Sequence, residues 1–317
     1  MKREMDRRHF LEMGAAAGAA VVAGEKILAQ ATPATARSRS QQADPASVPV
    51  RTTQLYDNLY LLQGAGGNMV LETGADGCLL IDASFAPAVP RIREAIAALA
   101  PAAAGGLLLN THHHSDHTGG NEGMHAAGFA IIAHRLTRAR LSTPQPMRLF
   151  HYTVPASPPG ALPAICIDQS LAIWRNGDSI EVAHFAPAHT DTDISIHFLK
   201  ADVLHVGDIW FNGGFPFIDE GANGTIGGMI RAGEQVLAMA SASTKIVPGH
   251  GPLGDKAGYE KYRNMLIAIR DKVAAMKAAG LSEEETIARK PTAAFDEAVG
   301  KGFMSADMFA GIVYRTL

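Results

Sequence analysis

One short run of the chain concentrates side chains that bind divalent metals. Residues 112 to 117 follow the pattern H-x-H-x-D-H, with imidazoles at His112, His114 and His117 and a carboxylate at Asp116. Imidazole and carboxylate groups are ligands that Zn²⁺ accepts, and a bound metal can make a hydroxide nucleophile at neutral pH. The run therefore indicates metal-dependent hydrolysis.

A chance origin of this run would predict no further ligands downstream. With 13 His in 317 residues, an accidental match has odds on the order of one in a thousand. Three later segments each deliver one more ligand type in a loop after a predicted strand: His189, Asp208 and His250. Such loop positions are where a rigid scaffold presents reactive side chains, so chance is the weaker interpretation.

With these residues in this order, the chain resembles the metallo-β-lactamase fold superfamily over roughly residues 50 to 255, and residues 111–122 are most similar to the type II glyoxalases. The resemblance implies an α/β fold, a four-layer αββα sandwich with two metals in a cleft at one edge. It also implies how the ligands divide: His112, His114 and His189 would hold one metal, and Asp116, His117 and His250 the other, with Asp208 bridging them.

The implied cofactors are two divalent metal ions, with Zn as the first choice and Fe or Mn as alternatives that accept the same ligands. Two ions about 3.5 to 4 Å apart can share one hydroxide and polarise a carbonyl. Asp116 is the predicted catalytic residue, because it can orient the attacking oxygen. In an extended turn, alternate residues share a side. His112, His114 and Asp116 then converge, and His113 points away to a supporting hydrogen bond.

Three neighbouring features have two interpretations each. Asp82 ends a buried strand, where it either binds the local backbone or, as the resemblance implies, supports the metal loop without touching metal. Residues 64–67 are either a tight turn or a hairpin that closes over substrate. Residues 142–163 are rich in Pro and lack periodicity, and we expect them to form a wall of the cleft.

Composition narrows the function further. The chain is 47% hydrophobic and 19% charged, enough to build one large core. Its net charge of −3 indicates no nucleic-acid-binding surface. A small-molecule substrate is therefore the predicted partner, and nothing in the sequence indicates an oligomeric state.

The N-terminus is predicted to direct export. Residues 6–12 resemble a twin-arginine signal, and the small-residue apolar run 13–27 and a cleavage-like Ala29-Gln30-Ala31 follow them. A membrane anchor is the alternative, but the run is shorter than the roughly 20 residues that span a bilayer. We predict a signal peptide over residues 1–31, a disordered linker over 32–50 and a hydrolase domain over 51–317. The mature protein would be periplasmic or secreted, without stable membrane insertion.

Periodicity and turns predict the elements of that domain. In the first half, strands are expected at 59–63, 68–72, 78–81, 106–109 and 129–133, with helices at 88–99 and 136–141. The second half repeats this plan, with strands near Ile165, Ile180, Ile194 and Val203, a helix at 226–240 and a strand at 246–247. A helix at 259–279 follows, and a further helical stretch runs through Pro291. Cys78 and Cys166 are predicted to be buried small hydrophobes.

The substrate is the least determined property. Superfamily β-lactamases that use a Cys ligand would place it where this chain has Asp208, and their substrate-binding lysine would fall at about Phe211. Asn223 could polarise a carbonyl or simply form a turn. The residues after His250 show no basic cluster for glutathione. We rank a β-lactamase-like hydrolase of a cyclic amide or ester first, a thioesterase or lactonase second, and a di-iron redox protein third.

Overall fold

The computed structural model describes residues 44–102 and 104–317. The predicted signal peptide and most of the predicted linker lie outside the described residues, so they remain predictions. Residues Pro45–Leu317 form one compact unit. In the part of the chain that is described, no helix combines the length and the apolarity needed to cross a membrane.

Two sheets dominate this unit. The first has seven strands in the order β1 (Arg51–Tyr56), β2 (Leu59–Gln63), β3 (Met69–Glu72), β4 (Cys78–Ile81), β5 (Gly106–Leu109), β6 (Phe129–His134) and β9 (Ile165–Ile167). The second has six, in the order β10 (Ser170–Arg175), β11 (Asp178–His184), β12 (Ile194–Phe198), β13 (Val203–His205), β14 (Lys245–Val247) and β15 (Gly254–Asp255). Strands β4, β5, β6 and β9 are parallel, and so are β13 and β14.

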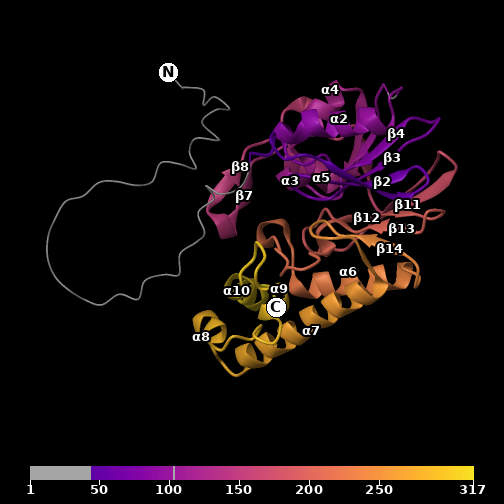
Figure 1. Cartoon of the computed structure of the whole chain (residues 1–317). Helices are drawn as coiled ribbons and strands as arrows, with labels where there is room; N and C mark the ends of the chain where they lie inside the picture. Colours follow the sequence, from indigo (N-terminus) through magenta and orange to yellow (C-terminus); the bar gives the residue numbers. More distant parts are fainter. Residues whose placement is uncertain (1–43, 103) are drawn as a thin grey trace, which may run out of the picture. The chain divides into compact units, whose positions relative to one another are not determined.

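Helices cover the outer faces of the two sheets, which gives four layers (Figure 1). The helices of the first half are α2 (Val89–Leu99), α3 (Ser115–Thr118), α4 (Asn121–Ala126) and α5 (Arg135–Leu141). Those of the second half are α6 (Ile226–Met239), α7 (Lys256–Ala278), α8 (Glu283–Ala288), α9 (Asp296–Val299) and α10 (Ala306–Arg315). The αββα sandwich implied by the resemblance is confirmed.

Three apolar clusters fill the three interfaces between these layers. Strand β4 shows why, because Leu79 and Ile81 pack between the sheets while Cys78 and Leu80 pack against the helices. The period of two along a strand sends alternate side chains to opposite faces, so a strand covered on both sides is apolar throughout. The third cluster joins the second sheet to α6, α7 and α10.

The structure differs from the sequence prediction at the edges of the sheets. The strand near Ile165 does not join the second half, because β9 pairs in parallel with β6 in the first sheet. Cys166 on this edge strand is exposed, contrary to prediction, and of the three residues of β9 only Ile167 is buried. Cys78 is buried, and neither cysteine is in a disulfide.

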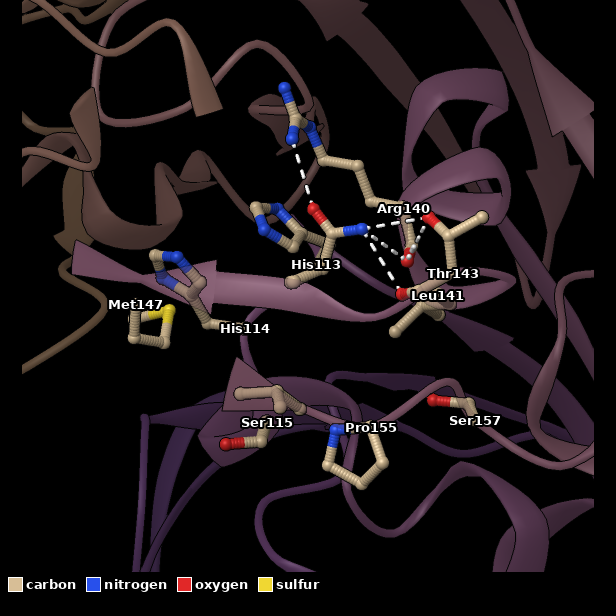
Figure 2. A pocket seen from close by; sticks show the side chains of 11 residues that line it. His113, His114, Ser115, Arg140, Leu141, Thr143, Met147, Pro155 and Ser157 are labelled. Carbon is tan, nitrogen blue, oxygen red and sulfur yellow. Dashed lines mark hydrogen bonds between the residues drawn. The ribbon is translucent and has the colours of Figure 1, made fainter. Parts of the chain in front are cut away.

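The predictions for two further segments, one irregular and one helical, are also wrong in detail. Residues 142–163 contain a short hairpin, β7 (Gln145–Met147) and β8 (Tyr152–Val154). The hairpin still forms a wall, because Met147 and Val154 line a pocket with a cavity of about 30 Å³ beside His114 (Figure 2). At the C-terminus α8 ends before Pro291, since the ring disfavours helical backbone at the preceding residue and removes a backbone donor.

Candidate metal centre

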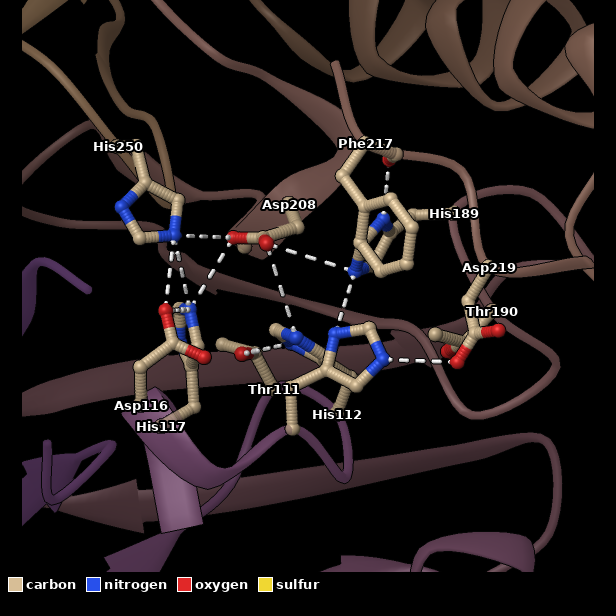
Figure 3. Close-up of polar contacts among 12 residues, drawn as sticks. Thr111, His112, Asp116, His117, His189, Thr190, Asp208, Phe217, Asp219 and His250 are labelled. Carbon is tan, nitrogen blue, oxygen red and sulfur yellow. Dashed lines mark hydrogen bonds and ion pairs between the residues drawn. The ribbon is translucent and has the colours of Figure 1, made fainter. Parts of the chain in front are cut away.

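The seven predicted ligands come together in one cluster, most of which is drawn in Figure 3. His112 and His114 follow β5, and Asp116 and His117 lie in the one-turn helix α3. The loops after β11, β13 and β14 bring the other three: His189, Asp208 and His250. Four separate chain segments thus meet because the strands that carry them end at the same edge.

The Asp208 carboxylate lies between two sets of imidazoles. Its Oδ2 is 3.7 Å from His112 Nε2 and 3.4 Å from His189 Nε2. Its Oδ1 is 3.2 Å from His117 Nε2 and 3.4 Å from His250 Nε2. One carboxylate oxygen therefore faces each set, which is the arrangement of a ligand shared by two metals.

Each set has the composition and the spacing of a metal site. Ligand atoms of His112, His114, His189 and Asp208 lie within 4.8 Å of one another, and so do those of Asp116, His117 and His250. The second set is more open, since the Asp116 and His250 side chains are 25% and 31% exposed. Asp116 Oδ2 is 3.2 Å from His250 Nε2, so this carboxylate lies on the accessible side of the centre.

The ring nitrogens that do not face the centre contact other groups. His117 Nδ1 donates to Asp82 Oδ2 at 2.7 Å, and His189 Nδ1 donates to the Phe217 carbonyl at 2.7 Å. His114 Nε2 donates to Asp219 Oδ2 at 3.0 Å, which leaves its Nδ1 facing His189 Nε2 at 2.9 Å. Such hydrogen bonds fix the tautomer and the ring orientation of a metal-binding histidine.

Asp82 directly follows β4 and connects the end of this strand to the H-x-H-x-D-H run. It is fully buried and accepts hydrogen bonds from the Thr111 backbone N–H at 2.8 Å and the Thr111 hydroxyl at 2.7 Å, besides the one from His117. The backbone that Asp82 binds is not local, because Thr111 lies 29 residues away, so the structure favours the interpretation that Asp82 supports the loop of candidate ligands. Its φ of 62° is a conformation that Asp tolerates better than most residues.

Two buried atoms of the cluster have no hydrogen-bond partner, His112 Nε2 and Asp208 Oδ1. A buried polar atom without a partner costs about 1 to 3 kcal/mol, so natural proteins rarely keep one. Both atoms point into the cluster, and both can donate an electron pair to a divalent metal. The residues present therefore fit a bound metal.

The electrostatics of the cluster favour the binding of a metal cation. Burial lowers the pKa of His112 well below its usual range and that of His189 to about 4, so both rings are neutral at pH 7. Burial alone would raise the pKa of Asp208, but the imidazoles of His250 and His117 outweigh it and hold that pKa well below its usual range. Neutral rings and an ionised carboxylate are the protonation states that metals require.

At the second set, nearby carboxylates outweigh burial and raise the pKa of the imidazoles. Burial opposes protonation of His250, but the Asp208 and Asp116 carboxylates outweigh burial and raise its pKa to about 10. Burial likewise opposes protonation of His117, yet Asp208 and Asp116 raise its pKa well above the usual range. Without metal, protons therefore balance the carboxylates at this set.

The prediction that the whole motif is an extended turn is wrong. Extended backbone continues through His114, whose ψ is 149°, and helix α3 begins at the next residue. Asp116 therefore joins His117 and His250 rather than His112 and His114. His113 does point away from the centre, as predicted, and its Nδ1 lies 3.2 Å from Thr192 Oγ1.

Glycines allow the loops to approach the ligands closely. A Cβ at Gly67 would lie 2.2 Å from His117 Cε1, and one at Gly249 would lie 1.9 Å from Asp208 Oδ1. The predicted hairpin at residues 64–67 thus packs directly on a candidate ligand. Nothing in the structure tests whether it closes over substrate.

Asn223 forms a turn rather than an arm of the centre. It has a φ of 61°, and its amide donates to the carboxylate of Asp191 at 2.7 Å. The sequence prediction missed Asp219 and the Phe217 carbonyl as partners of candidate ligands. No local pattern marks either of them, because their role follows only from the loop that brings them beside His114 and His189.

Known proteins resemble this chain in sequence or in fold to different degrees. Residues 60–280 match the family described as the metallo-beta-lactamase superfamily. The hydroxyacylglutathione hydrolase of Rhodospirillum rubrum is 30% identical over 190 residues, which cover 56% of this chain and 58% of that protein. That of Nitrosococcus oceani is 30% identical over 161 residues, 48% of this chain and 51% of that protein. The chain thus spans little more than half the length of these curated relatives.

Solved structures share the fold at low sequence identity. A metallo-beta-lactamase from Pontibacter korlensis superimposes with a TM-score of 0.58 at 15% identity, over 68% of this chain and 98% of that one. A double mutant of the sec-alkyl sulfatase PisA1 gives a TM-score of 0.65 at 15% identity, over 84% of this chain and 50% of that one. At such identities the likeness shows the fold and not the substrate.

Proposed function

Since the chain belongs to the metallo-β-lactamase superfamily, we propose that it is a metal-dependent hydrolase that cleaves an acyl thioester or ester at a centre of two divalent metals. The observation that carries this proposal is the Asp208 carboxylate, with one oxygen facing each set of imidazoles. A monodentate ligand to a single metal would not need both oxygens buried among four rings.

When bound, the two ions would supply a hydroxide nucleophile at neutral pH and polarise the scissile carbonyl. His112, His114 and His189 would hold the first ion, and Asp116, His117 and His250 the second, with Asp208 shared. Zn²⁺ is our first choice, although Fe and Mn suit the same donors. Asp116 is the accessible carboxylate of the cluster, and we assign it to accept a hydrogen bond from the attacking water and orient it.

The substrate ranking changes from that of the sequence alone. The curated relatives are named for hydrolysis of hydroxyacylglutathione, a thioester. Phe211 lies where a substrate-binding lysine would fall in β-lactamases, and its ring stacks on His250 at a centroid distance of 5.1 Å. That position offers no cation for a lactam carboxylate. A thioesterase or lactonase therefore moves to first place, and a β-lactamase-like activity becomes the second candidate, supported by the fold.

The test combines metal analysis of the purified protein with a substrate panel: a penicillin, a carbapenem, a homoserine lactone and a glutathione thioester. We expect close to two metals per chain and turnover of the thioester or the lactone with little lactam turnover. Lactams cleaved with the higher kcat/KM would favour the second candidate. A metal-loaded protein that turns over none of the four would contradict both.

We also propose that the chain is exported by the twin-arginine route to the periplasm or beyond. The support is the pair Arg7 and Arg8, the apolar run 13–27 and the cleavage-like residues 29–31. Fractionation and N-terminal sequencing test it, and the mature protein should begin near residue 32. A variant with Arg7→Lys and Arg8→Lys should remain in the cytoplasm. Uncleaved protein in the membrane fraction would instead support an anchor.

A further inference from the structure

A row of aromatic rings leads from the metal centre to the protein surface. The Phe217 ring lies 5.6 Å from the His114 ring and 5.8 Å from the His189 ring, measured between centroids. Phe150 lies 5.2 Å from Phe217, and Phe303 lies 5.4 Å from Phe150. We call Phe217, Phe150 and Phe303 the aromatic strip.

Three distant segments build this strip. Phe217 is in the loop after β13, Phe150 is in the turn of the β7–β8 hairpin, and Phe303 is in the loop before α10. Exposure rises along the row, because Phe217 is 7% exposed, Phe150 is partly buried and Phe303 is 65% exposed. One exposed Phe on a surface is ordinary. An exposed ring that continues a row from candidate ligands is a different case, because the row joins the surface to His114 and His189.

The pocket beside this strip has both polar and apolar walls, and Ser115, Thr143 and Ser157 are among the polar residues. Met147 and Val154 of the hairpin line the pocket next to His114, together with Leu141 and Pro155 (Figure 2). The cation of this pocket is already neutralised, since Arg140 donates from Nε and Nη2 to Asp191 at 2.6 and 2.5 Å. The strip therefore offers apolar contact, and the arginine of the pocket is paired and not free to bind an anion.

We propose that the aromatic strip binds an uncharged apolar acyl group of the substrate, an alkyl chain of medium length or an aryl ring, while its carbonyl lies at the metal centre. This inference rests on the proposed function, because it names the substrate class of the same centre. Rings such as these bury apolar groups with little loss of conformational freedom, since each has only two side-chain torsions.

The test measures kcat/KM for a thioester series with one leaving group and acetyl, butanoyl, hexanoyl, octanoyl and benzoyl acyl groups. Full burial of a methylene is worth about fourfold, so half burial along the strip gives about twofold per methylene. We expect octanoyl to exceed butanoyl by roughly tenfold or more. Phe150→Ala and Phe303→Ala should each reduce this ratio several-fold. Trp174→Ala removes an exposed aromatic ring outside the strip, 76% exposed on β10 compared with 65% for Phe303, and should leave the ratio unchanged.

A binding measurement separates this inference from the proposed function. Octanamide should bind the purified protein more tightly than butanamide in calorimetry, with a negative heat-capacity change that Phe150→Ala reduces. If kcat/KM does not depend on acyl chain length, or if the preference for octanoyl remains in both Phe variants, the strip does not bind the acyl group, while the proposed function still holds. If no acyl compound is hydrolysed, the proposed function fails, and octanamide binding alone then decides for or against the strip.

Discussion

Replacing Asp82 by Asn should disable His117 as a ligand without unfolding the protein. One Asp82 oxygen accepts the Thr111 backbone N–H, and the other accepts the Thr111 hydroxyl and His117 Nδ1. Asn has only one oxygen acceptor, and its amide nitrogen is a donor. If the Asn oxygen keeps the Thr111 N–H, the amide nitrogen faces His117 Nδ1. His117 must then carry its proton on Nε2, the atom that faces Asp208 Oδ1 at 3.2 Å. The opposite amide orientation places two donors against each other at the Thr111 backbone.

The size of the effect follows from this tautomer. Loss of a partner that orients a metal ligand costs typically 10-fold to 100-fold in metal affinity or activity, about 1.4 to 2.7 kcal/mol. We expect the upper part of that range, because the wrong tautomer places a proton on the donor atom itself. Asn is isosteric with Asp and adopts a φ near 62° as readily, so the fold should survive.

The assay is a metal titration against a competing chelator, on variants matched for circular dichroism. Asp178→Asn is the control, because Asp178 also accepts backbone N–H bonds, from Ser179 and Lys200, but contacts none of the seven candidate ligands. The control should bind metal like the original protein. If folded Asp82→Asn kept the original affinity, the tautomer argument would be refuted.

Three more outcomes follow from the centre. Asp208→Ala should lose at least one metal and most hydrolysis, measured by elemental analysis and kcat; full activity would remove Asp208 from the site. Gly67→Ala should weaken metal binding, because its Cβ would lie 2.2 Å from His117, whereas Gly214→Ala, which like Gly67 lacks a positive φ but has no atom within 4 Å of such a Cβ, should not. Metal affinity of the second set should rise with pH between about pH 6 and 9, since a proton on His250, whose pKa is about 10, competes with the metal. In metal-free protein the raised pKa of His250 stabilises the fold fully below its unfolded pKa near 6.5, and this stabilisation is lost as pH rises through about 10. A metal affinity that does not change with pH would contradict the first expectation, and a free energy of unfolding that does not change with pH would contradict the second.

The sequence by itself predicted the candidate ligands and most strands of this protein, and its resemblance to a known superfamily implied the four layers. The apolar alternation and the turns identified most strands, and the H-x-H-x-D-H run with three later strand ends brought seven residues to one edge. These features are local, because a few neighbouring residues decide where a strand stops and which side chain follows it. The short helix α3 was not predicted, because one turn of helix has too few residues to show a helical period in the sequence.

Only the tertiary structure decided what holds and surrounds those ligands. His117 meets Asp82 across 35 residues, His189 meets the Phe217 carbonyl across 28, and His114 meets Asp219 across 105. The pairing of β9 with the first sheet and the exposure of Cys166 are likewise set by the order of strands. Such partners depend on how distant loops fold back on one another, and no pattern of neighbouring residues encodes that. The aromatic strip belongs to the same class, because Phe150, Phe217 and Phe303 become one surface only after three separate segments have packed.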